Sequence, residues 1–205
     1  MNVPNKIKEI IKDYPLKKDE LGRSDKLIYF AKDKYVLKIS KSKKELAKEK
    51  DILLFLEGKL PVAKCLHYEE DEEYAYLLET FIDGVPLCSE EYLKNPLKLI
   101  NLLKKALDIF HKVDVSNCGF MNEYSKGSTF VHGDFCLPNI LVKDDKIVGF
   151  IDLNSSGLGD PYIDYSWCIW SFEYNLKTTK YTQLLLKELG IEFNKELFDK
   201  YVLED

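Results

Sequence analysis

The chain has 205 residues, 45% of them hydrophobic and 32% charged, with a formal net charge of -5. Its length fits one large domain or two small lobes, and its acidic balance argues against nucleic-acid binding. No apolar run is long enough to span a bilayer, and the first residues lack the apolar stretch of a signal peptide, so we expect a cytoplasmic protein without membrane contacts. The five cysteines include no C-x-x-C pair, and we interpret them as reduced thiols.

The first part of the chain alternates short apolar runs with turn residues, which predicts an antiparallel sheet with one main helix. A short helix after Pro4 ends near Tyr14-Pro15 and is expected to decorate an edge. We predict five strands at residues 16–21, 26–31, 35–39, 65–69 and 74–80. The main helix is predicted at residues 43–57, before the stop signal Gly58.

Lys38 lies in the middle of an apolar strand, where an ammonium group is rare unless it is paired. The following helix carries two candidate partners, Glu45 and Glu49. We favour Glu49 because it stands next to the apolar run of that helix. A strand lysine paired with a helix glutamate positions the α and β phosphates in kinases. The alternative is an edge-strand lysine whose ammonium reaches solvent.

Two further segments of the first part are candidates for nucleotide contacts. The turn Gly22-Arg23-Ser24 could hold phosphates with its backbone amides and the Ser24 hydroxyl, although an ordinary hairpin turn fits it as well. Gly84 and Pro86 mark a crossover to a second lobe. There an adenine could hydrogen-bond to the backbone of Thr80 and Ile82.

The second part of the chain reads as mostly helical. Asn95-Pro96 predicts the start of a helix that runs to His111, which we interpret as a core residue at the helix end. Residues 114–130 are predicted to form a loop. Further helices are predicted at residues 161–175, 178–189 and 194–203.

Three polar residues stand on a loop and at the end of a hairpin that is otherwise apolar. Asp134 precedes Asn139 by five residues, and Asp152 closes the next strand. In phosphoryl transfer, one carboxylate orients the attacking hydroxyl and takes its proton, while Mg²⁺ needs one or two further carboxylate or amide oxygens. The spacing therefore predicts Asp134 as the catalytic base and Asn139 and Asp152 as metal ligands.

The motifs together resemble the aminoglycoside phosphotransferases, most closely the 3′-phosphotransferase branch. They are His132-Gly133-Asp134, Leu137-Pro138-Asn139-Ile140, Phe150-Ile151-Asp152, Gly159-Asp160-Pro161 before Asp164, Leu56-Glu57-Gly58-Lys59-Leu60-Pro61-Val62, and Cys88-Ser89-Glu90-Glu91-Tyr92. The resemblance implies an α+β, two-lobed, protein-kinase-like fold. The nucleotide-binding lobe would span residues 1–80, with a five-stranded antiparallel sheet and one main helix. A hinge at residues 81–84 and a mostly helical catalytic lobe at residues 85–205 would follow.

The resemblance also implies an activity and its site residues. The enzyme would transfer the γ-phosphate of ATP, or of GTP, to a hydroxyl of a cationic deoxystreptamine-type antibiotic, with Mg²⁺, and so give antibiotic resistance. The implied residues are Asp134 as base, Asn139 and Asp152 on the metal, Lys38 with Glu49 on the α and β phosphates, Ser24 in the nucleotide loop, and Thr80 and Ile82 at the hinge. We expect a monomer.

The chain departs from the pattern of the family in several places. Val36 is aliphatic where relatives often stack an aromatic ring on the adenine, Asn154 replaces a common glycine and Ser155 a common arginine. Relatives carry a long helical insert where this chain has only the loop after Asp114, and further residues at the C-terminus; both supply part of an acidic cleft for the antibiotic. The acidic residues that remain as candidates for that cleft are Glu173, Asp160, Glu204 and Asp205.

Two alternatives to the aminoglycoside kinase follow from these departures. The first is a small-molecule kinase of the same fold that acts on another hydroxyl, such as that of another antibiotic, a sugar or an amino alcohol. The second is a nucleotide-binding protein without kinase activity.

Overall fold

The computed structural model of the protein describes residues 3–12, 14–19 and 26–202. The chain forms two compact units. The first unit comprises Met1–Glu57 and Val62–Asp83, and the second comprises Gly58–Pro61 and Gly84–Asp205. The step between Asp83 and Gly84 falls inside the segment 81–84 that the sequence marks as a hinge.

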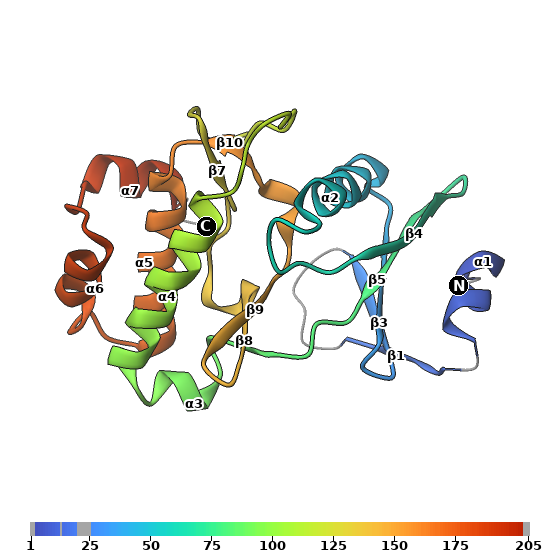
Figure 1. Ribbon diagram of the computed structural model, residues 1–205, viewed down its shortest axis with the longest axis horizontal. Helices are drawn as coiled ribbons and strands as arrows, with labels where there is room; N and C mark the ends of the chain where they lie inside the picture. The colour runs from blue at the N-terminus through green and yellow to red at the C-terminus, as the bar shows by residue number, and fades with distance from the viewer. Residues whose placement is uncertain (1–2, 13, 20–25, 203–205) are drawn as a thin grey trace. The chain divides into compact units, whose positions relative to one another are not determined.

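The first unit is built on a five-stranded antiparallel sheet with the order β1-β2-β3-β5-β4 (Figure 1). Its strands are β1 (Leu16–Lys18), β2 (Leu27–Ala31), β3 (Tyr35–Ser40), β4 (Cys65–Glu70) and β5 (Ala75–Thr80). All five lie where the sequence predicts strands, although β1 ends at Lys18 rather than at residue 21. The predicted α+β fold with this sheet is confirmed.

Alternation along the central strands gives the sheet two different faces. Leu37, Ile39 and Leu78 pack on one face against α1 (Asn5–Ile11), whose Ile7 and Ile11 are buried in the same cluster. The expectation that this first helix only decorates an edge is therefore wrong, because its isoleucines lie one turn apart and complete a core. The other face is covered by α2 (Lys43–Leu56), which contacts β4 and β5.

The second unit combines two small sheets with helices (Figure 1). One sheet has the order β6-β8-β9, from β6 (Val85–Pro86), β8 (Ile140–Lys143) and β9 (Lys146–Phe150). The other pairs β7 (Thr129–Val131) with β10 (Gly157–Gly159). The sequence does not predict β6, β7 or β10 because strands of two or three residues show no alternation of their own.

The helices of the second unit are α3 (Glu90–Leu93), α4 (Pro96–His111), α5 (Tyr162–Leu176), α6 (Thr182–Leu189) and α7 (Lys195–Tyr201). In α4, the Asn95 side chain accepts a hydrogen bond from the Lys98 N–H, and Pro96 occupies the first turn, as the sequence predicts. The prediction for α6 starts too early, since this helix begins at Thr182 rather than at residue 178. Within the described residues, no helix is both long and apolar enough to cross a membrane.

An aromatic cluster forms the centre of the second unit. The ring of Phe110, at the end of α4, lies 5.7 Å from Phe130, 6.1 Å from Phe135 and 5.0 Å from Phe150. All four side chains are fully buried. Because Phe130 and Phe135 bracket the segment 131–134, this packing fixes both ends of the loop that carries Asp134.

Candidate functional site

The lysine predicted to need a partner has one on the main helix of the first unit. Lys38 Nζ lies 2.6 Å from Glu49 Oε1, and both residues are buried, with exposed fractions of 8% and 1%. Burial by itself would raise the pKa of Glu49, but the positive charges of Lys38 and Lys26 outweigh it and lower this pKa to about 2. Glu45, the other candidate, is exposed.

Two further charged residues join this pair, and the sequence does not single them out. Lys26 Nζ lies 2.9 Å from Glu49 Oε2, and Glu79 Oε1 lies 2.9 Å from Lys38 Nζ. Glu79 is on β5 and is 4% exposed. A glutamate inside the apolar strand 75–80 is the one signal that could have identified it, by the same argument as for Lys38. The first unit therefore contains a buried cluster of two lysines and two glutamates.

The predicted nucleotide contacts at the end of β5 are partly occupied by the protein itself. The Thr80 N–H donates to the Lys64 carbonyl at 3.0 Å, and the Thr80 hydroxyl oxygen accepts from the Lys64 N–H at 2.9 Å. An adenine at this edge would therefore use the Thr80 carbonyl rather than its N–H. Ile82 follows the strand as an irregular residue. Ser24 lies outside the described residues.

In the second unit, Asp134 and Asn139 are brought into direct contact. The Asn139 side-chain amide donates to Asp134 Oδ2 at 2.9 Å and to the Asp134 carbonyl at 3.0 Å. Asn139 lies in the 3₁₀ turn Leu137–Asn139, which folds the chain back toward Asp134. Because the amide nitrogen is used in this way, Asn139 keeps its side-chain oxygen for another partner.

Asp152 stands at the same end of the β8–β9 hairpin as Asn139. The Ile151 N–H donates to the Asn139 carbonyl at 3.1 Å, directly beyond the last pair of the ladder, Ile140 with Phe150. Asp152 follows with left-handed backbone angles, φ 59° and ψ 55°. The hairpin thus explains how residues 13 positions apart present a carboxylate and an amide at one edge.

Asp164, a buried carboxylate on α5, accepts hydrogen bonds from the loop that carries Asp134. Its two oxygens accept from the backbone N–H groups of His132 and Gly133, both at 2.9 Å, and from His111 Nε2 at 2.9 Å. Asp164 has no exposed surface. His111, which the sequence predicts to be a core residue, is partly exposed and pairs with the buried Asp164. The sequence motif includes Asp164 but does not reveal this positioning role, since its partners are 31 to 53 residues away.

Two more contacts order the same loop. His132 Nε2 donates to the Ile151 carbonyl at 3.1 Å, so its Nδ1 is the acceptor for the Asp134 N–H at 3.3 Å. Gly133 has φ 82°, and a Cβ at that position would lie 2.6 Å from the Ser155 carbonyl oxygen. The His-Gly-Asp sequence therefore has a physical reason: the histidine fixes the loop and only glycine fits between it and Asp134.

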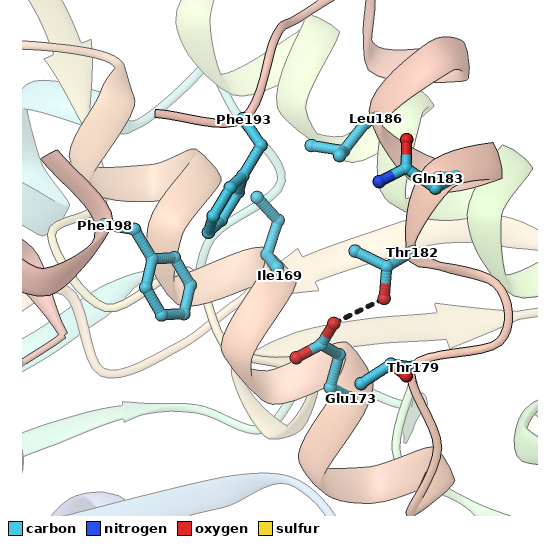
Figure 2. Close-up of a pocket in the computed structure, with 8 residues that line it drawn as sticks. All are labelled: Ile169, Glu173, Thr179, Thr182, Gln183, Leu186, Phe193 and Phe198. Atoms are coloured by element: carbon cyan, nitrogen blue, oxygen red, sulfur yellow. Dashed lines mark hydrogen bonds between the residues drawn. The ribbon is translucent and has the colours of Figure 1, made fainter. Parts of the chain in front are cut away.

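A pocket of about 400 Å³ lies beside α5 (Figure 2). Ile169 and Glu173 of α5 line it, together with residues of α6 and α7, and the Thr182 hydroxyl donates to the Glu173 carboxylate. The Ser171 hydroxyl oxygen accepts a hydrogen bond from the Leu137 N–H at 3.0 Å. Ser171 therefore lies on the other side of the helix from Ile169 and Glu173. Glu173, one candidate for the acceptor cleft, is thus not brought together with Asp134. The Tyr201 hydroxyl donates a hydrogen bond to Asp160 Oδ2 at 3.2 Å.

Comparison with known proteins identifies the family to which the chain belongs. The model of the phosphotransferase enzyme family matches residues 16–127 and 125–185. The chain belongs to this family. It is 30% identical to an aminoglycoside 3′-phosphotransferase of Enterococcus faecalis and to another of Staphylococcus aureus, in both cases over all of this chain and 98% of the relative. The resemblance read from the motifs is confirmed, and the protein is a phosphotransferase.

Solved structures agree on the fold. The aminoglycoside phosphotransferase APH(3'')-Id of Streptomyces rimosus, in complex with ADP and streptomycin, superposes with a TM-score of 0.78 at 16% identity and covers 95% of this chain and 93% of its own. An aminoglycoside 3′-phosphotransferase of type VIII superposes with a TM-score of 0.77 at 16% identity and covers 95% of each chain.

The comparison also shows what this chain lacks. The alignment with the Enterococcus faecalis relative runs over 259 positions, whereas this chain has 205 residues, so at least 54 of those positions have no counterpart here. The two segments matched by the family model meet at residues 125–127, in the connection between α4 and β7. In this same connection the sequence predicts that the helical insert of the relatives is missing.

Proposed function

We propose that this protein transfers the γ-phosphate of ATP to a hydroxyl of an aminoglycoside antibiotic, at the 3′ position, and so gives resistance to it. The observation that carries the proposal is the side-chain hydrogen bond of 2.9 Å between Asn139 and Asp134, at the end of a hairpin that also presents Asp152. The relatives named aminoglycoside 3′-phosphotransferase support the choice of acceptor.

In the proposed reaction Asp134 is the catalytic base. The acceptor hydroxyl donates a hydrogen bond to the Asp134 carboxylate, its oxygen bonds to the γ-phosphorus, the bond to the β–γ bridging oxygen breaks, and the hydroxyl proton passes to Asp134. The carboxylate acts mainly by orienting the hydroxyl. The Asn139 side-chain amide donates to Asp134 Oδ2 and so helps to fix the orientation of this carboxylate.

The residues at the end of the hairpin fit a magnesium site. Asn139 offers its side-chain oxygen, since its nitrogen is already bonded to Asp134, and Asp152 offers a carboxylate. One carboxylate and one amide oxygen suit Mg²⁺, which completes its shell with phosphates and water. Among the described residues there is no cluster of three or more acidic, histidine or cysteine side chains that would form an all-protein metal cage. When bound, Mg²⁺ would neutralise charge on the phosphates.

The first unit is proposed to bind the donor nucleotide. Lys38, held by Glu49, would contact the α and β phosphates, Ser24 would belong to the phosphate loop, and Thr80 and Ile82 would meet the adenine. ATP is the proposed donor, with GTP as an alternative. We further propose that the enzyme acts as a monomer in the cytoplasm, without nucleic-acid or membrane partners.

A second candidate keeps the chemistry and changes the acceptor. An aminoglycoside carries several ammonium groups, so its cleft needs acidic residues. The 54 or more positions without a counterpart favour another acceptor, and so does Glu173, which lines the pocket beside α6 and α7 instead of lying against Asp134. The acceptor would then be another hydroxyl compound, such as a sugar or an amino alcohol.

An ADP-release assay with Mg²⁺ and ATP tests both candidates. Pairs of aminoglycosides with and without the 3′-hydroxyl should differ, with turnover only where the hydroxyl is present. Asp134→Asn should lower kcat by about 10²- to 10⁴-fold. ADP release that responds to a sugar or an amino alcohol, but to no aminoglycoside, would replace the first candidate by the second. Asp134→Asn with unchanged kcat would refute the assignment of the base.

A further inference from the structure

Lys38 contacts two buried carboxylates rather than one. Its Nζ lies 2.6 Å from Glu49 Oε1 and 2.9 Å from Glu79 Oε1, and the two glutamates are 1% and 4% exposed. Glu49 reaches it from α2, whereas Glu79 reaches it from the neighbouring strand β5. In the register of the sheet Lys38 faces Leu77, so Glu79 is its diagonal neighbour on the face that α2 covers. Lys38 is therefore held from two directions.

The two carboxylates are not equivalent. Both oxygens of Glu49 have a lysine partner, Lys38 on Oε1 and Lys26 on Oε2. Glu79 has only Lys38, and its buried Oε2 makes no hydrogen bond with any residue that the structure describes. A buried carboxylate oxygen without a partner is unfavourable, and a proton on it removes the charge that burial penalises.

The surroundings of Glu79 agree with this difference. The titratable groups that face it are Lys38 on β3, Lys26 before β2, Glu49 on α2 and Cys65 on β4. Burial raises the pKa of Glu79 and Glu49 adds to the rise, against the opposing effect of Lys38. The pKa of Glu49 is instead lowered to about 2. Of the two carboxyl groups, Glu79 is the one that can gain a proton.

We propose that Glu79 is a positioning residue that holds Lys38 in the free enzyme and takes up a proton when the phosphates of the nucleotide bind to Lys38. The inference rests on the proposed function, because it needs a nucleotide at Lys38. It adds a coupled proton that the lysine–glutamate pair alone does not require.

The charge balance of the cluster gives the reason. In the free enzyme the two lysines and two glutamates sum to zero. The ammonium of Lys38 has three N–H donors and uses two on carboxylates, so phosphate oxygens would take the third. They bring negative charge close to Glu79 in a dry environment, where like charges repel strongly. One proton from solvent, bound to Glu79 Oε2, removes this repulsion and leaves Glu49 charged between its two lysines.

Calorimetry on the full chain tests the proposal. The binding enthalpy of MgATP is measured at pH 7 in two buffers of different ionisation enthalpy, which counts the protons taken up. Glu79→Gln is the test variant, since its amide oxygen can still accept from Lys38. Glu73→Gln is the matched control, because Glu73 is exposed and pairs with the exposed Lys41 at 3.1 Å.

We expect the wild type and Glu73→Gln to take up more protons than Glu79→Gln, by up to one per ATP bound. Their Kd for MgATP should rise with pH, by up to tenfold per pH unit, more steeply than that of Glu79→Gln. The KM for ATP should lose its pH dependence in Glu79→Gln, because the amide cannot bind the coupled proton.

Equal proton uptake and equal pH dependence in the wild type and Glu79→Gln would overturn the proposal. If the wild type binds no MgATP, the proposed function itself fails and this inference with it. Should Glu79→Gln fail to fold, infrared difference spectra of the wild type with ¹³C-labelled glutamate decide. A protonated carboxyl band that appears on adding MgATP supports the proposal, and its absence refutes it.

Discussion

Replacing Asp164 by asparagine tests whether this buried carboxylate holds the catalytic loop. Its oxygens accept three hydrogen bonds of 2.9 Å, from the His132 N–H, the Gly133 N–H and His111 Nε2. In Asp164→Asn the remaining oxygen can serve Gly133, and the new amide N–H can be accepted by the other tautomer of His111. The His132 N–H then has no acceptor. We therefore expect the variant to fold with its catalytic loop displaced.

The size of the effect follows from these contacts. A buried N–H without a partner costs about 1–3 kcal/mol, and the loss of the charge on the bond to Gly133 adds about 1 kcal/mol. The free energy of unfolding should fall by about 2–4 kcal/mol in Asp164→Asn. A misplaced Asp134 should also lower kcat by about 10- to 100-fold.

Urea unfolding followed by tryptophan fluorescence is the assay of choice. Both tryptophans of the chain, Trp167 and Trp170, lie on α5 with Asp164, so the signal reports on the second unit. Asp108→Asn is the matched control: Asp108 is half exposed on α4 and pairs with Lys104 at 3.8 Å, and we expect a change below about 0.5 kcal/mol. Equal stability and equal kcat of the two variants would refute the role given to Asp164.

Two further predictions concern stability. Gly133→Ala should lower the free energy of unfolding by about 2 kcal/mol or more, because alanine is strained at this left-handed position and its Cβ would clash. Gly119→Ala is the control and should not lose stability, since no atom lies within 4 Å of the added Cβ. Urea unfolding compares the two variants, and equal losses would contradict the steric reason. The lowered pKa of Glu49 means that its stabilising effect is complete above pH 4.5, the value for the unfolded chain, and is lost as the pH falls to about 2. Glu49→Gln should therefore lower the free energy of unfolding by about 3–5 kcal/mol at pH 7, and its stability should depend less on acid pH. Circular dichroism measures this dependence, and Glu45→Gln, at an exposed position, should behave as the wild type. A wild-type stability that does not change between pH 4.5 and 2 would refute the assignment.

Local patterns were enough to predict much of the first unit. The strands alternate apolar residues between turn signals, and the main helix has its own composition and stop, so five strands and α2 lie where the sequence places them. Lys38 stands out because an ammonium in an apolar strand needs a partner, and Glu49 lies at the right place on the next helix. The family, and with it the phosphotransferase activity, follows from motifs whose residues are close in the chain.

The second unit shows where local patterns stop being informative. Strands β6, β7 and β10 have two or three residues each and exist only through their partners. The first unit contains one such case as well. The sequence predicts the first helix at an edge, because nothing in its own residues shows that Ile7 and Ile11 meet the sheet.

The sequence alone singles out Asp134, Asn139 and Asp152 as candidates, because their spacing reflects one loop and one hairpin. The contacts that support them come from distant parts of the chain and are visible only in the folded protein. Asp164 reaches back 31 residues to Gly133 and 53 to His111, and Glu79 reaches Lys38 across two paired strands. No periodicity or spacing encodes such contacts, since they arise when packing removes water from groups that must then satisfy one another. The sequence by itself determined the family and predicted its reacting groups, and the tertiary structure decided which buried charges surround those groups.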